Sequence, residues 1–234
     1  MTTPADAPRP PSTTRIDMVP LQRPDHADYL ALLALTNPGE QLPAATSDLL
    51  TMPPFAAPFT HGPALCLTAR PRRSSNPKPA GALFASFPEW ASAHALVQGD
   101  PQLSALLNRA ALFVYGVAVT PSRRGHGIAR ALLTEAESRA RTAGYRMSTL
   151  LHTPELTPFY QRMGYTSAHH VTIAMRHAGM GLTQPSPYMT AIKPLHPNVQ
   201  IREIPGAPGP VVAGLLPGWD LPPHARFNDG RLLT

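Results

Sequence analysis

The residues best suited to chemistry lie in a short basic, glycine-rich turn at residues 123–130, which reads Arg-Arg-Gly-His-Gly-Ile-Ala-Arg. Gly125 and Gly127 have no Cβ, so a ligand can come close to the backbone there. The turn leads into a helical pattern, and the first N–H groups of a helix have no intrahelical partner and carry partial positive charge. This combination predicts a site for a phosphate or pyrophosphate group.

Two common phosphate-binding motifs do not fit this turn. A P-loop ends in Gly-Lys-Ser/Thr, and the chain has no lysine between Lys78 and Lys193. A dinucleotide fingerprint needs a third glycine at the position that Arg130 occupies. The remaining pattern is Arg124-x-x-Gly127-x-Ala129.

That pattern resembles the acetyl-CoA signature of the GCN5-related N-acetyltransferase (GNAT) superfamily. The segment 157–165 resembles the second motif of the family through Tyr160, Gly164 and Tyr165. The resemblance implies an acyltransferase that uses acetyl-CoA as its acyl donor, with Val117 and Val119 holding the pantetheine arm through their backbone. The implied cofactor-binding residues are Val117, Val119, Arg124, Gly125, His126, Gly127, Ile128, Ala129 and Arg130.

The implied reaction is direct attack of a primary amine on the thioester in a ternary complex. Tyr160 is the expected catalytic acid, because a phenol with a pKa near 10 can return a proton to a departing thiolate. The general base stays open, since the central strand 112–119 contains no carboxylate. A water chain is one alternative, and the candidate side chains are Tyr115, His152, Glu89 and His94.

Three other residues near the turn and the central strand have two possible roles each. Gly116 either eases the strand splay that would admit the pantetheine arm or marks a packing gap. Arg123 and Arg130 either meet phosphates or are solvated. We expect no metal site, because His169 and His170 are adjacent on a strand and therefore point to opposite faces. The lone cysteine, Cys66, lies in an apolar run and is expected to be buried.

Apolar periodicity predicts the elements that position these residues. The expected class is α/β, a single GNAT-like domain with a mixed, mostly antiparallel central sheet flanked by helices. A largely helical insertion is expected at 88–108, and 177–187 is expected to be a loop. The expected strands are 15–20, 64–69, 81–87, 110–119, 147–151, 171–175 and 188–192, and the helices are 25–35 (capped by Asp25), 46–50, 126–143 and 155–163.

The thirty prolines concentrate outside this core. We therefore expect a disordered N-terminal segment at 1–14, an acetyltransferase domain at 15–195 and a Pro/Gly-rich tail at 196–234. Proline and glycine interrupt the tail too often for regular elements, yet it is apolar enough to dock on its own domain or on a second chain. A homodimer is accordingly left open.

The net charge of +6 suits the phosphates of coenzyme A. Only 15% of the residues are charged and no helix carries a basic stripe, so we expect no nucleic-acid partner. No segment looks like a signal peptide or a membrane span, and we expect a cytoplasmic protein with no membrane partner. The expected acceptor is a small-molecule amine. The alternatives are a protein N-terminal or lysine acetyltransferase and a non-catalytic acetyl-CoA-binding module.

Overall fold

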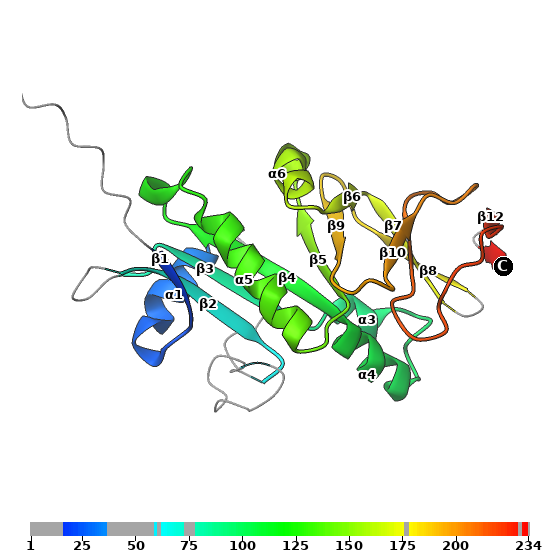
Figure 1. Cartoon of the computed structure of the whole chain (residues 1–234), viewed down its shortest axis with the longest axis horizontal. Helices are drawn as coiled ribbons and strands as arrows, with labels where there is room; N and C mark the ends of the chain where they lie inside the picture. The colour runs from blue at the N-terminus through cyan, green and yellow to red at the C-terminus, as the bar shows by residue number, and fades with distance from the viewer. Residues whose placement is uncertain are drawn as a thin grey trace, which may run out of the picture.

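The computed structural model describes residues 16–36, 59, 62–72, 78–175, 178–228 and 231–233. A seven-stranded sheet forms its centre, in the order β1-β2-β3-β4-β5-β9-β6 (Figure 1). Strands β4 and β5 are parallel and all other neighbours are antiparallel, so the predicted mixed sheet is confirmed. The strands are β1 (Ile16–Pro20), β2 (Leu65–Pro71), β3 (Gly81–Ser86), β4 (Ala111–Val119), β5 (Met147–His152), β6 (Thr166–Ala168) and β9 (Met189–Pro194).

Two helices cover opposite faces of this sheet. On one face, α5 (Ile128–Thr142) buries Leu132 and Leu133 in a cluster with Leu83 of β3. On the other face, α1 (His26–Leu33), which follows the short helix η1 (Arg23–Asp25), packs Tyr29 against Phe84. Because successive strand residues point to opposite faces, the neighbours Leu83 and Phe84 place the two helices on the two sides.

Asp25 does not cap α1 through its side chain, contrary to the prediction. The carboxylate instead forms an ion pair with Arg70 of β2. The partner lies 45 residues away in the chain, and helix-capping rules consider only local partners. The tertiary contact therefore replaces the cap.

Strand β4 contains a bulge. Phe84 of β3 faces Gly116, whereas the next residue, Ala85, faces Val114, so Tyr115 is an extra residue on β4. The side chains that pack toward α5 accordingly shift from Leu112 and Val114 to Val117 and Val119. A bulge bends its strand and increases the local twist.

The insertion is helical, as predicted, with α3 (Glu89–Ala93) and α4 (Pro101–Ala110). Asp100 caps α4, because its Oδ1 accepts a hydrogen bond from the backbone N–H of Leu103 at 2.9 Å. The insertion packs at the beginning of β4 and β5, where Leu107 shares a buried cluster with Met147.

A second sheet lies beside this cluster and differs from the prediction. It has the order β10-β11-β7-β8, with β7 (His170–Ala174), β8 (Gly179–Thr183), β10 (Gln200–Arg202) and β11 (Val211–Ala213). The expected loop at 177–187 therefore contains a strand. The two glycines of β8 hide its pattern, but Met180 and Leu182 alternate and are buried.

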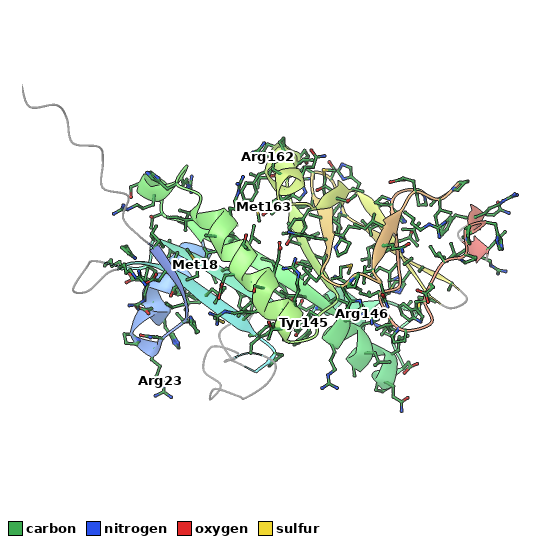
Figure 2. The ribbon with its side chains drawn as sticks, viewed as in Figure 1. Met18, Arg23, Tyr145, Arg146, Arg162 and Met163 are labelled. Carbon is green, nitrogen blue, oxygen red and sulfur yellow. The ribbon has the colours of Figure 1, made fainter. Side chains whose placement is uncertain are left out.

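The segment beyond residue 196 also contains regular elements, against expectation. Its strand β11 runs parallel to β7, and β12 (Arg226–Asn228) pairs with β13 (Arg231–Leu233). Its apolar side chains dock on the same chain: Val212, Leu215 and Trp219 are buried with Met147. Arg146, labelled in Figure 2, ties the segment down by donating from Nη2 to the carbonyl of Gly214 at 3.0 Å.

Some predictions lie outside the described residues. These are the disordered segment 1–14 and the helix 46–50. In the part of the chain that is described, no helix is long and apolar enough to cross a membrane.

Candidate active site

The glycine-rich turn forms an open cradle at the start of α5. Gly125 and Gly127 have φ values of 79° and 77°, in the left-handed region that side chains with a Cβ avoid. Gly127 is the N-cap residue, and no side chain caps the helix there. Residues 121–127 are all exposed. The first amides of α5 are therefore free to bind an anion.

Hydrogen bonds within the turn fix its shape. Arg124 donates from Nε to the carbonyl oxygen of Val119 at 3.3 Å, which folds its side chain back over the end of β4. The Nδ1 atom of His126 lies 2.8 Å from the carbonyl oxygen of Arg124, and a carbonyl can only accept, so Nδ1 carries the proton. His126 thus shapes the turn. Arg123 and Arg130 are exposed beside it.

Strands β4 and β5 separate next to this cradle. Their pairing ends at Val114 and Leu150, whereas β4 stays paired with β3 as far as Val119. Among the described strands, the backbone groups of β4 beyond the bulge that face β5 therefore have no partner. Val117 and Val119 lie in this stretch, so an extended ligand arm can bind their backbone as a strand would.

Gly116 lies directly after the bulge and against α1. A Cβ built on Gly116 would lie 3.3 Å from Leu33 Cδ2 and from the side chain of Thr36. The residue therefore serves close packing, and its neighbour Tyr115 makes the bulge.

Tyr160 lies on α6 (Thr157–Arg162), which follows the short helix η3 (Pro154–Leu156). The residue is 9% exposed, and its side chain belongs to the cluster under α5. Its ring centroid is 4.8 Å from that of His152, 5.1 Å from Phe159 and 5.8 Å from Tyr165. Burial alone raises the pKa of Tyr160 to about 12, so its hydroxyl is protonated at neutral pH.

The four candidate bases differ in what they contact. Tyr115 donates from its hydroxyl to the carbonyl of Phe87 at 3.0 Å, and burial, aided by the charge of Glu89, raises its pKa to about 12. This phenol therefore keeps its proton at neutral pH and is not the base. Glu89 itself is exposed at the first turn of α3.

Both candidate histidines are engaged. His94 accepts a hydrogen bond at Nδ1 from the backbone N–H of Leu96 at 3.2 Å. His152 uses both of its ring nitrogens, one toward the carbonyl of Thr153 and one toward the hydroxyl of Ser167. Neither ring presents an unoccupied Nδ1 atom as a ready proton acceptor.

A buried polar cluster under α5 was missed from the sequence. The hydroxyl of Tyr165 lies 3.0 Å from that of Ser148, and burial followed by the charge of Glu137 raises the pKa of Tyr165 well above its usual value. Glu137 also accepts a hydrogen bond from Lys193. The i,i+4 spacing in the sequence predicts the pair of Glu137 with Arg141, but its contact with Lys193 depends on the tertiary fold.

The two adjacent histidines bind other groups. His169 interacts through Nδ1 with the carbonyl of Tyr188, and His170 interacts with the hydroxyls of Thr183 and Thr172. Within the described ranges, no three His, Cys, Asp or Glu side chains are grouped so that they could hold a metal ion. Cys66 is 1% exposed, as predicted.

Comparison with known proteins agrees with this architecture. A family model for the acetyltransferase (GNAT) domain matches residues 93–167, a span that contains the cradle, the strand separation and Tyr160. No curated protein matches the chain. Residues 93–167 therefore match a GNAT acetyltransferase domain, and the fold of the chain is similar to that of solved GNAT structures.

Two solved structures illustrate the shared fold. One is the GNAT family N-acetyltransferase YhbS from Escherichia coli in complex with CoA, with 20% identity, a TM-score of 0.52, and coverage of 83% of this chain and 85% of that chain. The other is a chain of the NatC complex bound to Gag peptide and CoA, with 17% identity, a TM-score of 0.51, and coverage of 76% and 98%. At these identities the similarity describes the fold.

Proposed function

We propose that this protein transfers an acetyl group from acetyl-CoA to a primary amine, by direct attack in a ternary complex. The observation that carries this proposal is the separation of β4 from β5 beyond Val114, directly before the cradle at Gly125 and Gly127. An anion-binding helix start and an unpaired strand edge, joined in sequence, suit a ligand with a pyrophosphate and an extended arm.

Each part of the site has a role in this proposal. The amides of residues 125–130 hold the pyrophosphate, and Arg124 adds positive charge. The backbone of Val117 and Val119 binds the pantetheine arm, and an N–H group of β4 polarises the thioester carbonyl. The fit rests on the two left-handed glycines and on the uncapped start of α5.

Tyr160 supplies the proton for the leaving group. The amine nitrogen forms a bond to the carbonyl carbon, the carbon–sulfur bond breaks, and the thiolate takes the proton of the Tyr160 hydroxyl. The raised pKa of Tyr160 makes it a weak acid. Burial also disfavours the charged form of a departing thiolate, which favours its protonation by the phenol. The ammonium loses one proton to water before attack, the nitrogen loses a second after the bond to carbon forms, and a proton from water restores the Tyr160 hydroxyl.

We take the acceptor to be a small molecule. The unpaired stretch of β4 beyond Val114 is assigned to the pantetheine arm, and the other edge of β4 is paired with β3, so β4 leaves no further edge for an extended peptide. The insertion does not decide the matter, because it packs at the beginning of β4. A protein N-terminal or lysine acceptor is therefore an outcome to be tested. The homodimer and the cytoplasmic location remain predictions.

One observation favours a second function. The ring of Tyr160 is largely buried among aromatic neighbours, which is also what a purely structural residue would show. A non-catalytic acetyl-CoA-binding module would have the same cradle.

A screen with free-thiol detection separates these functions. The purified chain is incubated with acetyl-CoA and, in turn, small monoamines, polyamines and peptides with a free α-amine or lysine. We expect amine-dependent thiol release with a small amine. Release only with peptides would assign a protein acceptor. Tight acetyl-CoA binding by calorimetry, with no amine-dependent release across the panel, would assign the binding module.

A further inference from the structure

We propose that His152 is a positioning residue that sets the orientation of Tyr160. The proposal rests on the catalytic function of Tyr160 proposed above. It concerns a residue at the end of β5, where the strand leads through η3 into the helix that carries Tyr160.

Two hydrogen bonds fix the imidazole of His152. Its Nδ1 atom lies 2.7 Å from the carbonyl oxygen of Thr153, and its Nε2 atom lies 2.8 Å from the hydroxyl oxygen of Ser167. Because a carbonyl can only accept, Nδ1 donates, and in the neutral ring Nε2 accepts the Ser167 proton. The side chain is also buried, with 4% of the residue exposed. The ring therefore has one orientation.

Tyr160 depends on its neighbours for its orientation. Among the described residues, its hydroxyl makes no side-chain hydrogen bond of the kind that holds the hydroxyls of Tyr29, Tyr115 and Tyr165. Ring contacts must hold it instead. Phe159 and Tyr165 meet the Tyr160 ring edge-on, with interplanar angles of 76° and 75°.

His152 makes the third ring contact and the most nearly parallel one. The centroids lie 4.8 Å apart and the ring planes are 33° apart. Both nitrogens of the His152 ring form hydrogen bonds, one with the backbone of Thr153 and one with Ser167 of β6, so the ring gives Tyr160 a fixed surface to pack against. A small error in the position of a catalytic group can lower the rate strongly, so loss of this packing surface is expected to reduce kcat.

The first test compares His152→Phe with His169→Phe. Phenylalanine keeps a ring of similar size at position 152 but loses both hydrogen bonds. We expect kcat to fall by about tenfold or more, while KM for acetyl-CoA stays within about twofold. Ser167→Ala, which removes one anchor, should lower kcat less. His169 is exposed, and its substitution should leave kcat unchanged. Wild-type kcat in a folded His152→Phe variant would overturn the proposal.

A double-mutant cycle shows whether His152 acts through Tyr160. In a Tyr160→Phe background, His152→Phe should produce no further loss of kcat, because the group that it positions is already gone. Losses that multiply would instead assign His152 an independent role and overturn the proposal.

A third readout does not depend on turnover. In the protein without ligand, Tyr160→Phe should leave the hydrogen bonds of His152 intact, whereas Tyr160→Ala should free its ring face and shift its imidazole NMR signals. An unchanged signal in Tyr160→Ala would contradict the contact. If the wild type acetylates no amine, the proposed function fails. The NMR comparison still tests whether the rings of His152 and Tyr160 are in contact.

Discussion

Lys193 lies on β9 and places its ammonium group 2.6 Å from Oε2 of Glu137 on α5. The same nitrogen donates to the carbonyl oxygen of Met163 at 2.6 Å. Both side chains are largely buried, with 5% of Glu137 and 17% of Lys193 exposed. This one ammonium group therefore joins the cradle helix, the central sheet and the turn after the Tyr160 helix.

Replacing Lys193 by methionine should destabilise the protein. Among the described residues, the change leaves the buried Glu137 carboxylate with Arg141, at 3.5 Å, as its remaining cationic partner, and loss of one partner of a buried pair costs about 3 kcal/mol. Denaturant unfolding measures the change.

Two further variants serve as references for the Lys193 result. Arg139→Met breaks the more exposed pair with Glu135 and should cost about 0.5 kcal/mol. The double variant Glu137→Met, Lys193→Met should recover most of the loss. Equal losses for Lys193→Met and Arg139→Met would contradict a role for burial.

Gly127→Ala should weaken the binding of acetyl-CoA by about tenfold or more. A side chain at a φ of 77° strains the turn and lies beside the amides that hold the pyrophosphate. Calorimetric titration measures the dissociation constant.

Gly99→Ala provides a matched control for Gly127→Ala. Gly99 has a φ of 94°, and a Cβ there would meet nothing within 4 Å, as at Gly127, but it lies in the insertion. Both variants should lose similar stability, about 1 kcal/mol. Equal affinity of the two variants for acetyl-CoA would remove the cradle assignment.

The parts of the fold that the sequence predicts are those with local signals. The strand-to-helix turn at residues 119–128 was placed correctly, because Pro121 and two glycines interrupt the apolar pattern there. Gly116 indicated an irregularity in this strand, but the extra residue, Tyr115, could not be identified, since residues 111–119 are apolar throughout. The second sheet depends on the pairing of β11 with β7, whose partners are about 40 residues apart in the chain.

For the candidate site, too, the sequence predicts the local parts and not the tertiary contacts. The cradle and Tyr160 belong to contiguous motifs. The environment of Tyr160 comes from His152, Ser167 and Tyr165, which only the tertiary fold brings together.

Leu215→Ala should show that the segment beyond residue 196 is part of the core. Leu215 is fully buried in the cluster that contains Met147, and truncation of such a leucine costs about 2–5 kcal/mol. Leu106→Ala is the control, because Leu106 is 53% exposed and its truncation should change stability by less than about 0.5 kcal/mol. Unfolding curves that coincide for Leu215→Ala and the wild type would contradict the docking of this segment.

The protein should lose stability at alkaline pH. Burial raises the pKa of Tyr115, Tyr145 and Tyr160 from 10.0 to about 12. A raised folded-state pKa contributes stability that is present below pH 10, where the unfolded tyrosines are neutral, and is lost as pH rises toward 12. Tyrosinate absorbance and circular dichroism should therefore change together between pH 10 and about pH 12. Ionisation of these tyrosines near pH 10, before unfolding, would contradict their burial.

The measurement that tests the central claim most directly is the steady-state kinetics of Tyr160→Phe with an amine that the wild type acetylates. Phenylalanine keeps the ring contacts with His152, Phe159 and Tyr165 and removes the proton donor. We predict that kcat falls by roughly 10²–10⁴ while KM for acetyl-CoA and the melting temperature stay near those of the wild type. A folded variant with wild-type kcat would contradict the account and leave Tyr160 as a structural residue.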